Sequence, residues 1–171
     1  TAFSINFTGL PSGSLFPIGA TQLEFVIEDN SGNKDTCDFM VTVMDVEAPV
    51  IQNCPPDTVL SNDPGICGAV YSYVPIVATD NCLGSITPSQ IDTTGYSSGD
   101  VFPVGTTVLS FAVIDSSGNG DTCSFSITVN DTETPQLVCI PDTTILNNTD
   151  TCGAFFSYSI PTALDNCDTI L

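Results

Sequence analysis

Apolar and polar residues alternate along most of the chain, and no helical period persists for more than a turn. The clearest alternation runs through residues 123–129 and 37–43, and it recurs at 109–113. A period of two residues is typical of half-buried strands. Residues 70–74 and 155–160 are rich in β-branched and aromatic side chains, which predicts two further strands.

Turn-forming residues separate these expected strands. They include the pair Pro103 and Gly105, the run Ser117-Gly118-Asn119 and the run Asp63-Pro64-Gly65. Short strands joined by such turns predict an all-β fold, and the antiparallel β-sandwich fits best.

The sequence also repeats itself after about 85 residues. The four cysteines Cys37, Cys54, Cys67 and Cys82 each have a counterpart at that distance, in Cys123, Cys139, Cys152 and Cys167. In this frame, residues 1–46 are the C-terminal half of a repeat, 47–132 a complete repeat and 133–171 the N-terminal half of the next.

The two half-repeats have complementary contents. In the complete repeat 20 residues separate Cys82 from Phe102, and the same 20 separate Cys167 from Phe16 if the end of the chain is continued into its start. We therefore expect the chain to be one two-domain period of a longer array. The alternative is a fragment with accidental ends.

The cysteines suggest stapled domains in an oxidising, extracellular compartment. In a seven-strand sandwich the first and last strands begin at the same end, which favours pairing Cys54 with Cys123. The remaining cysteines of a repeat would close a 15-residue loop worth roughly 3 kcal/mol. The expected disulfides are Cys54–Cys123, Cys67–Cys82, Cys152–Cys167, and a bond across the seam between Cys37 and Cys139 of neighbouring copies.

Composition excludes several functions. The chain has 20 acidic residues, one basic residue, no histidine and a net charge of −19. Such a surface repels nucleic acid and anionic lipid, and no apolar run is long enough to insert into a membrane. Without imidazole or arginine we expect no enzymatic activity. An acid-pair glycosidase would need a substrate cleft, and the sequence has no insertion that would build one.

Several motifs together resemble tandem hyalin repeat (HYR) domains. They are Cys54-Pro55, Ala78-Thr79-Asp80-Asn81-Cys82, Phe102-Pro103-Val104-Gly105 and Asp115-Ser116-Ser117-Gly118-Asn119. The resemblance implies immunoglobulin-like β-sandwiches in a secreted or cell-surface protein with an adhesive or structural role. Long arrays of such repeats, together with the acidic composition, suggest a bacterial-type surface protein.

Acidic residues of the linkers and of two loops suggest calcium sites at the repeat junctions, similar to those of cadherins. Ca²⁺ takes six to eight oxygen ligands from carboxylates, amides and carbonyls. An ordinary turn without metal remains the alternative for the loop sequences. The candidate ligands are Asp45, Glu47, Asp80, Asn81, Asp115 and Asn119 at the first junction, and Asp131, Glu133, Asp165 and Asn166, with Asp29 and Asn33 of the following copy, at the second.

These observations predict a structural module of an extracellular rod or filament, whose partners are copies of itself or flanking repeats placed end to end. The alternative is an adhesin that binds a glycan or protein ligand. Its binding loop would lie in residues 83–101, where the two copies differ most. One giant chain and separate strand-exchanging subunits would give the same contacts.

Overall fold

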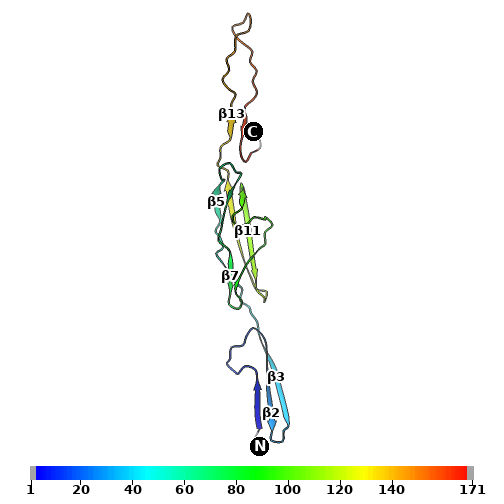
Figure 1. The fold of residues 1–171 in the computed structure, drawn as a ribbon. Coiled ribbons are helices and arrows are strands. Elements are labelled where there is room, and N and C mark those ends of the chain that lie inside the picture. The colour runs from blue at the N-terminus through cyan, green and yellow to red at the C-terminus, as the bar shows by residue number, and fades with distance from the viewer. Residues whose placement is uncertain (1–2, 169–171) are drawn as a thin grey trace.

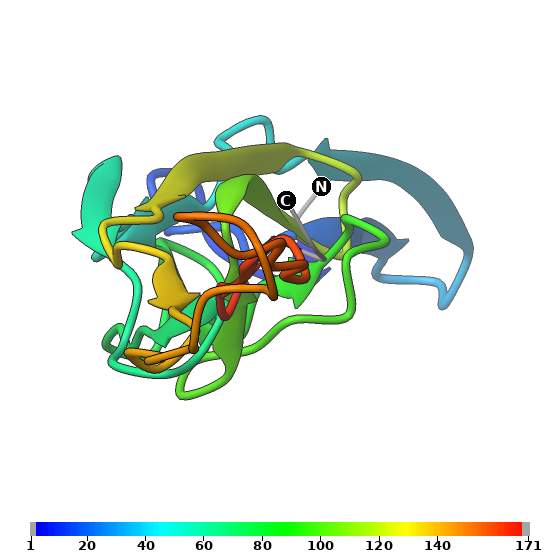
Figure 2. The ribbon, with the colours of Figure 1, turned by 90° about the horizontal axis from the view of Figure 1, so that it is seen from above.

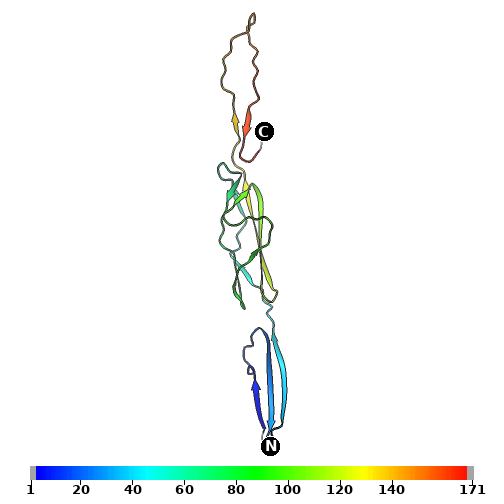
Figure 3. The ribbon, with the colours of Figure 1, turned by 45° about the vertical axis from the view of Figure 1, so that its right-hand side comes forward.

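The computed structural model describes residues 3–168 as three β-rich bodies arranged end to end (Figure 1). A view turned by 45° gives the same elongated outline (Figure 3), and a view from above superimposes the three bodies (Figure 2). The secondary structure of residues 3–168 consists of strands and turns, which confirms the all-β prediction. None of these residues forms a helix long and apolar enough to cross a bilayer.

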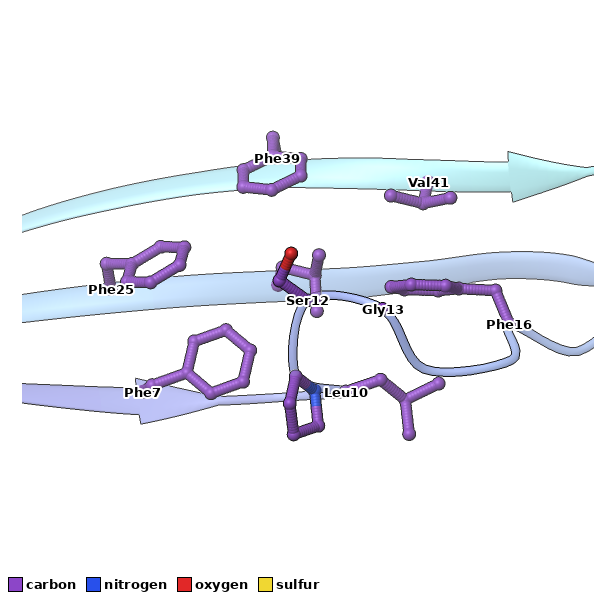
Figure 4. Close-up of a pocket in the computed structure, with 10 residues that line it drawn as sticks. Phe7, Leu10, Ser12, Gly13, Phe16, Phe25, Phe39 and Val41 are labelled. Atoms are coloured by element: carbon purple, nitrogen blue, oxygen red, sulfur yellow. The ribbon is translucent and has the colours of Figure 1, made fainter.

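The first body is a single antiparallel sheet. Strands β2 (Gly19–Asp29) and β3 (Lys34–Val43) form a long hairpin, and β1 (Phe3–Thr8) pairs with the other edge of β2. The predicted strand at 37–43 lies within β3. One face of this sheet carries aromatic side chains that remain 38–47% exposed (Figure 4), so no second layer among the described residues covers this face.

The second body is the complete repeat, an immunoglobulin-like β-sandwich. One sheet has the order β5-β12-β11-β9 and another has the order β4-β7-β8, while β6 and β10 pair separately. Strand β12 pairs antiparallel with β11 but parallel with β5. The strands are β4 (Val50–Gln52), β5 (Thr58–Ser61), β6 (Gly68–Val70), β7 (Val77–Asp80), β8 (Gly84–Ile86), β9 (Ser89–Gln90), β10 (Val101–Pro103), β11 (Gly105–Ile114) and β12 (Gly120–Asn130).

Alternation along β11 and β12 builds the core of this sandwich. Their inward residues are Thr107, Leu109, Phe111 and Val113 on β11 and Cys123, Phe125, Ile127 and Val129 on β12, all buried. Two tyrosines from the segment that follows β6 close the core. The ring of Tyr73 lies 5.2 Å from that of Phe125, and the ring of Tyr71 lies 6.3 Å from that of Phe102.

The third body contains one short antiparallel pair, β13 (Gln136–Val138) and β14 (Thr162–Leu164). The strand predicted at 155–160 is absent, and of the strand predicted at 70–74 only Val70 lies in a strand, as the last residue of β6. In the complete repeat β6 pairs with β10. The counterpart of β10 is residues 15–17, in the first body, so residues 153–155 have no strand beside them to pair with.

The disulfides confirm one prediction and overturn two. Cys54 bonds Cys123, as expected from sandwich topology. The predicted pairs Cys67–Cys82 and Cys152–Cys167 are wrong, because Cys67 instead bonds Cys167 of the next repeat. The remaining cysteines of the described chain are unpaired and exposed; they are Cys37, Cys82, Cys139 and Cys152.

The short loop between Cys67 and Cys82 misled the sequence prediction because it spans the length of the sandwich. Cys67 lies two residues after Gly65, whose backbone N–H donates a hydrogen bond to Glu133 in the linker to the next repeat. Cys82 lies beside Asp45 in the linker from the preceding one. The two sulfur atoms are therefore at opposite ends of one domain.

Candidate metal centres at the repeat junctions

The linker into the complete repeat brings acidic side chains against the loop after β7. A carboxylate oxygen of Asp45, a carboxylate oxygen of Asp80 and the Sγ atom of Cys82 all lie within 4.8 Å of one another. Asp45 comes from the linker, whereas Asp80 is the last residue of β7. The structure therefore brings together two predicted ligands that are 35 positions apart in the sequence.

One oxygen of this cluster lacks a partner. Asp80 Oδ1 accepts hydrogen bonds from the backbone N–H groups of Cys82 (2.7 Å) and Leu83 (2.9 Å), which fixes the side chain. Asp80 Oδ2 is buried and has no hydrogen-bond partner. A buried, uncompensated carboxylate oxygen is costly, so it marks a position that suits a cation.

Other predicted ligands of the first junction surround this pair. The Nδ2 of Asn81 donates to Glu47 Oε2 at 2.8 Å, and the backbone N–H of Glu47 donates to Asp45 Oδ1 at 3.2 Å. From the β11–β12 turn, Asn119 Nδ2 donates to the carbonyl oxygen of Asp45 at 3.3 Å. Linker, β7 loop and hairpin turn thus meet at one end of the sandwich.

The second junction repeats this arrangement. Oxygens of Asp131 and Asp165 cluster with Sγ of Cys167 within 4.8 Å, and Asp165 Oδ1 accepts from the backbone N–H groups of Cys167 and Asp168. Here the unpartnered buried atoms are the Oδ1 and Nδ2 of Asn166. Because Cys167 is disulfide-bonded, its sulfur is not a thiolate ligand, and the oxygens are the candidate ligands.

Glu133 differs from its counterpart Glu47. Its carboxylate turns back to the preceding repeat, where it accepts from the backbone N–H of Gly65 at 2.9 Å and from Asn62 Nδ2 at 3.3 Å. Asn62 Oδ1 in turn accepts from the backbone N–H of Thr132 at 3.0 Å. Asn62 is buried, and it ties the linker to the domain that the linker leaves.

Sequence reasoning missed this contact. It identified the run from Asp63 to Gly65 as a turn but gave Asn62 no role. The available signal was that Asn147 occupies the equivalent place in the next copy. Both side-chain amides make the same local bond, to the carbonyl oxygen of Ile66 at 3.2 Å and of Thr151 at 2.8 Å respectively.

The turn explanation accounts well for Asp115. Its Oδ1 accepts from the backbone N–H groups of Ser117 and Asn119, and its Oδ2 accepts from Asn119 Nδ2 at 2.8 Å. Burial acts to raise the pKa of Asp115, but the bonds from Asn119 and Ser117 outweigh it and leave the pKa below its ordinary value. The left-handed Gly118 (φ 93°) completes this turn.

Asp29 and Asn33 form the same turn in the first body. Asp29 Oδ2 accepts from Asn33 Nδ2 at 2.9 Å, and this bond is the main cause that lowers the pKa of Asp29. The turn lies at the far end of the β2–β3 hairpin (Figure 1), away from the candidate ligands of both junctions. The predicted role of these residues, in a junction with another copy, stays a prediction.

The carboxylates gathered at each junction make the electrostatic potential there negative. At the first, desolvation raises the pKa of the Cys82 thiol, and the carboxylates of Asp45, Asp80 and Glu47 raise it further. Hard oxygen donors in a negative field suit Ca²⁺ better than Zn²⁺, which prefers thiolate and imidazole. The residues present therefore fit calcium.

The complete sandwich, the sequence repeat and the acidic cluster at each end of the sandwich together define a class of protein: tandem immunoglobulin-like β-domains with acidic junctions. The HYR domain family matches residues 2–43 and 44–129. The chain therefore belongs to the HYR domain family.

Relatives of known identity are animal proteins. Hyalin of Strongylocentrotus purpuratus is 36% identical over 167 residues, covering 94% of this chain and 13% of that protein. Hyalin of Lytechinus variegatus is 32% identical, covering 93% of this chain and 30% of that protein. A rat sushi, von Willebrand factor type A, EGF and pentraxin domain-containing protein is 30% identical, covering 85% of this chain and 4% of that protein. The bacterial-type origin expected from the sequence has no support among them.

The human desmocollin-1 ectodomain aligns with 96% of this chain and 38% of its own, at 12% identity and a TM-score of 0.29. This likeness is too low to add to the fold assignment. The chain spans less than a third of each of the relatives named above.

Proposed function

We propose that this chain is a structural module of an extracellular rod, in which junctions stiffened by disulfides and calcium hold successive HYR domains end to end. The observation that carries the proposal is the repetition of one junction. Asp45 with Asp80 and Asp131 with Asp165 form equivalent carboxylate pairs, each beside a cysteine and an unpartnered buried polar atom. Equivalent geometry at both junctions favours a mechanical role over a unique binding site.

Calcium would neutralise carboxylates that otherwise repel one another. Asp45 and Asp80 would hold the ion at the first junction, with Asp131, Asp165 and Asn166 at the second. Each set draws ligands from a linker and from the following domain, so a bound ion would fix the angle between domains. The high net negative charge would keep a long array soluble.

Residues 83–101, the candidate binding loop of the adhesin alternative, are held to the rest of their own domain by hydrogen bonds. Asp92 Oδ2 accepts from the backbone N–H of Ser110 at 2.9 Å, and Ser98 Oγ donates to the carbonyl oxygen of Tyr73 at 2.9 Å. These contacts give residues 92–98 a structural role within the complete repeat. They favour a rod module over a loop displayed for a glycan or protein ligand.

Calcium titration tests this function directly. Titration calorimetry of the chain should detect Ca²⁺ binding, and small-angle scattering should show fewer inter-domain orientations in calcium than in chelator. Asp80→Asn should weaken binding at the first junction at least tenfold. Glu24→Gln, which removes one charge from a half-buried position on β2 far from the candidate ligands, is the matched control. Identical scattering in chelator and in millimolar calcium would refute the calcium-stiffened rod.

A further inference from the structure

We propose that Asn130, the last residue of β12, carries an N-linked glycan that covers the start of the linker to the third body. The triplet Asn130-Asp131-Thr132 fits the acceptor sequence Asn-X-Ser/Thr, in which X is any residue except proline. The inference does not depend on calcium or on the rod-forming role, because it concerns one exposed side chain of the complete repeat.

The disulfides indicate a compartment in which this modification takes place. The bond between Cys54 and Cys123 fastens the complete repeat, and structural disulfides form in oxidising compartments such as the lumen of the endoplasmic reticulum. The relatives named above are animal proteins, and animal cells attach N-glycans to chains that enter this lumen. An acceptor triplet in this chain is therefore a candidate for use.

The side chain of Asn130 points away from the core and is free to carry a sugar. Alternation along β12 buries Val129, which is 1% exposed, and leaves Asn130 exposed. Within residues 3–168 the side-chain amide of Asn130 makes no hydrogen bond. Its neighbour on β5 is Ser61, which is small and exposed. A first sugar would therefore meet solvent and a small side chain rather than packed atoms.

The backbone at Asn130 is held in place, so the glycan would project from a fixed position. The carbonyl oxygen of Asn130 accepts a hydrogen bond from the backbone N–H of Asn62 at 2.9 Å. Two residues on, Thr132 Oγ1 donates to Asn62 Oδ1 at 3.2 Å. The hydroxyl of the triplet is thus engaged in the folded chain, so glycan transfer precedes the docking of the linker on the sandwich.

A second triplet, residues 147–149, has a different environment. Asn147 Nδ2 donates to the carbonyl oxygen of Thr151 at 2.8 Å, which holds a local turn. The counterpart of Asn147 in the complete repeat is Asn62, which is only 7% exposed and has no room for a sugar. The triplets look alike in the sequence, and their surroundings favour Asn130.

The transfer is a substitution at a sugar carbon. Asn130 Nδ2 attacks C1 of the first N-acetylglucosamine of an oligosaccharide linked to a polyprenyl diphosphate. The N–C1 bond forms as the bond from C1 to the diphosphate oxygen breaks. The diphosphate leaves with the electron pair, and Nδ2 loses one of its two protons. The step needs no oxidant or reductant.

A glycan at this position would shield the second linker from proteases. Residues 131–135 are exposed and lie outside any strand, and exposed segments of this kind are preferred sites of proteolytic cleavage. The first linker has no acceptor triplet, because Met44 occupies the position of Asn130. The two linkers of one chain should therefore differ in their resistance to proteases.

Secretion of the whole chain from cultured animal cells tests the site. Peptide N-glycosidase in H₂¹⁸O converts a glycosylated asparagine to ¹⁸O-labelled aspartate, and peptide mapping distinguishes Asn130 from Asn6 and Asn147, which begin the other triplets. Most copies should be labelled at Asn130. Asn130→Gln should abolish this label, whereas Asn30→Gln, at an exposed asparagine outside any triplet, should not. An unmodified Asn130 in chains that contain the Cys54–Cys123 disulfide would overturn the inference.

Digestion with a Glu-specific protease tests the shielding. Cleavage after Glu133 should be several-fold faster in Asn130→Gln than in the glycosylated chain. Cleavage after Glu47, at the equivalent position of the first linker, is the internal control and should be equally fast in both. Equal rates after Glu133 would overturn the shielding role, provided that the complete repeat unfolds alike in both chains. Neither test involves calcium, so failure here leaves the proposed rod function standing.

Discussion

Cys67 and Cys167 form a disulfide although they are 100 residues apart in the sequence and belong to different repeats. The bond joins the turn before β6 to the loop after β14. It lies beside the linker, where Glu133 contacts Gly65. A covalent bond and a hydrogen-bonded linker therefore fix the same junction.

Removing this disulfide should loosen the junction without unfolding the sandwich. We expect the double variant Cys67→Ala with Cys167→Ala to sample a wider range of orientations between the second and third bodies, measured by small-angle scattering. The unfolding free energy of the complete repeat should change by less than about 1 kcal/mol, because neither cysteine is among its core residues. An unchanged scattering profile would show that the bond does not restrict the junction.

The intra-domain disulfide should behave in the opposite way. Cys54 and Cys123 are 69 residues apart, and closing a loop of that size stabilises the folded state by about 4 kcal/mol on the chain-entropy account. Cys54→Ala with Cys123→Ala should lower the unfolding free energy by up to that amount in denaturant titrations. A loss below about 1 kcal/mol would mean that this bond does not stabilise the sandwich.

The linker contact of Glu133 can be tested by amide exchange. Glu133→Ala removes the acceptor of the Gly65 N–H, and a hydrogen bond to a charged group contributes about 1.5–3 kcal/mol. We expect exchange at Gly65 to accelerate about tenfold. Glu47→Ala is the control, because Glu47 bonds Asn81 at the other junction. Equal protection of Gly65 in both variants would contradict the contact.

Asp92 gives the complete repeat a pH dependence. Burial acts to raise the pKa of Asp92, but hydrogen bonds from Thr94, Ser110 and Gln90 outweigh it and lower the pKa to about 2. A depressed folded-state pKa adds stability above the unfolded value near 3.8, and this stability is lost as the pH falls toward 2.

Asp92→Asn should therefore lower the unfolding free energy by about 1–2 kcal/mol at pH 7, after allowance for solvent screening. The difference from the unaltered chain should shrink between pH 4 and pH 2, as measured by denaturant titrations across that range. A difference independent of pH would show that the carboxylate charge is not the source of the effect.

The fold could be predicted because its signals are local. Strict alternation from Cys123 to Val129 identified the strand that became the inner part of β12, and sandwich topology identified Cys54 as its partner. The strand predicted at 155–160 from its β-branched and aromatic side chains did not form. A strand needs a neighbour to hydrogen-bond, and that neighbour is not beside this segment in the third body.

The junction could be predicted only in part. Linker and loop carboxylates such as Asp45 and Asp80 could be placed together from topology alone. The partner of Cys67 could not, because a loop-length argument favours the nearer cysteine, and only the three-dimensional path shows that Cys82 lies at the other end of the domain. Asn62 was missed for a similar reason, since its contacts with Thr132 and Glu133 cross 70 residues or more of sequence.

Peptide mapping of the oxidised chain under non-reducing conditions tests the central claim, that successive repeats are covalently fixed at their junction. The account predicts a linked peptide pair that contains Cys67 and Cys167. Linked pairs Cys67–Cys82 and Cys152–Cys167, each within one repeat, would contradict it and leave the junction without its covalent bond.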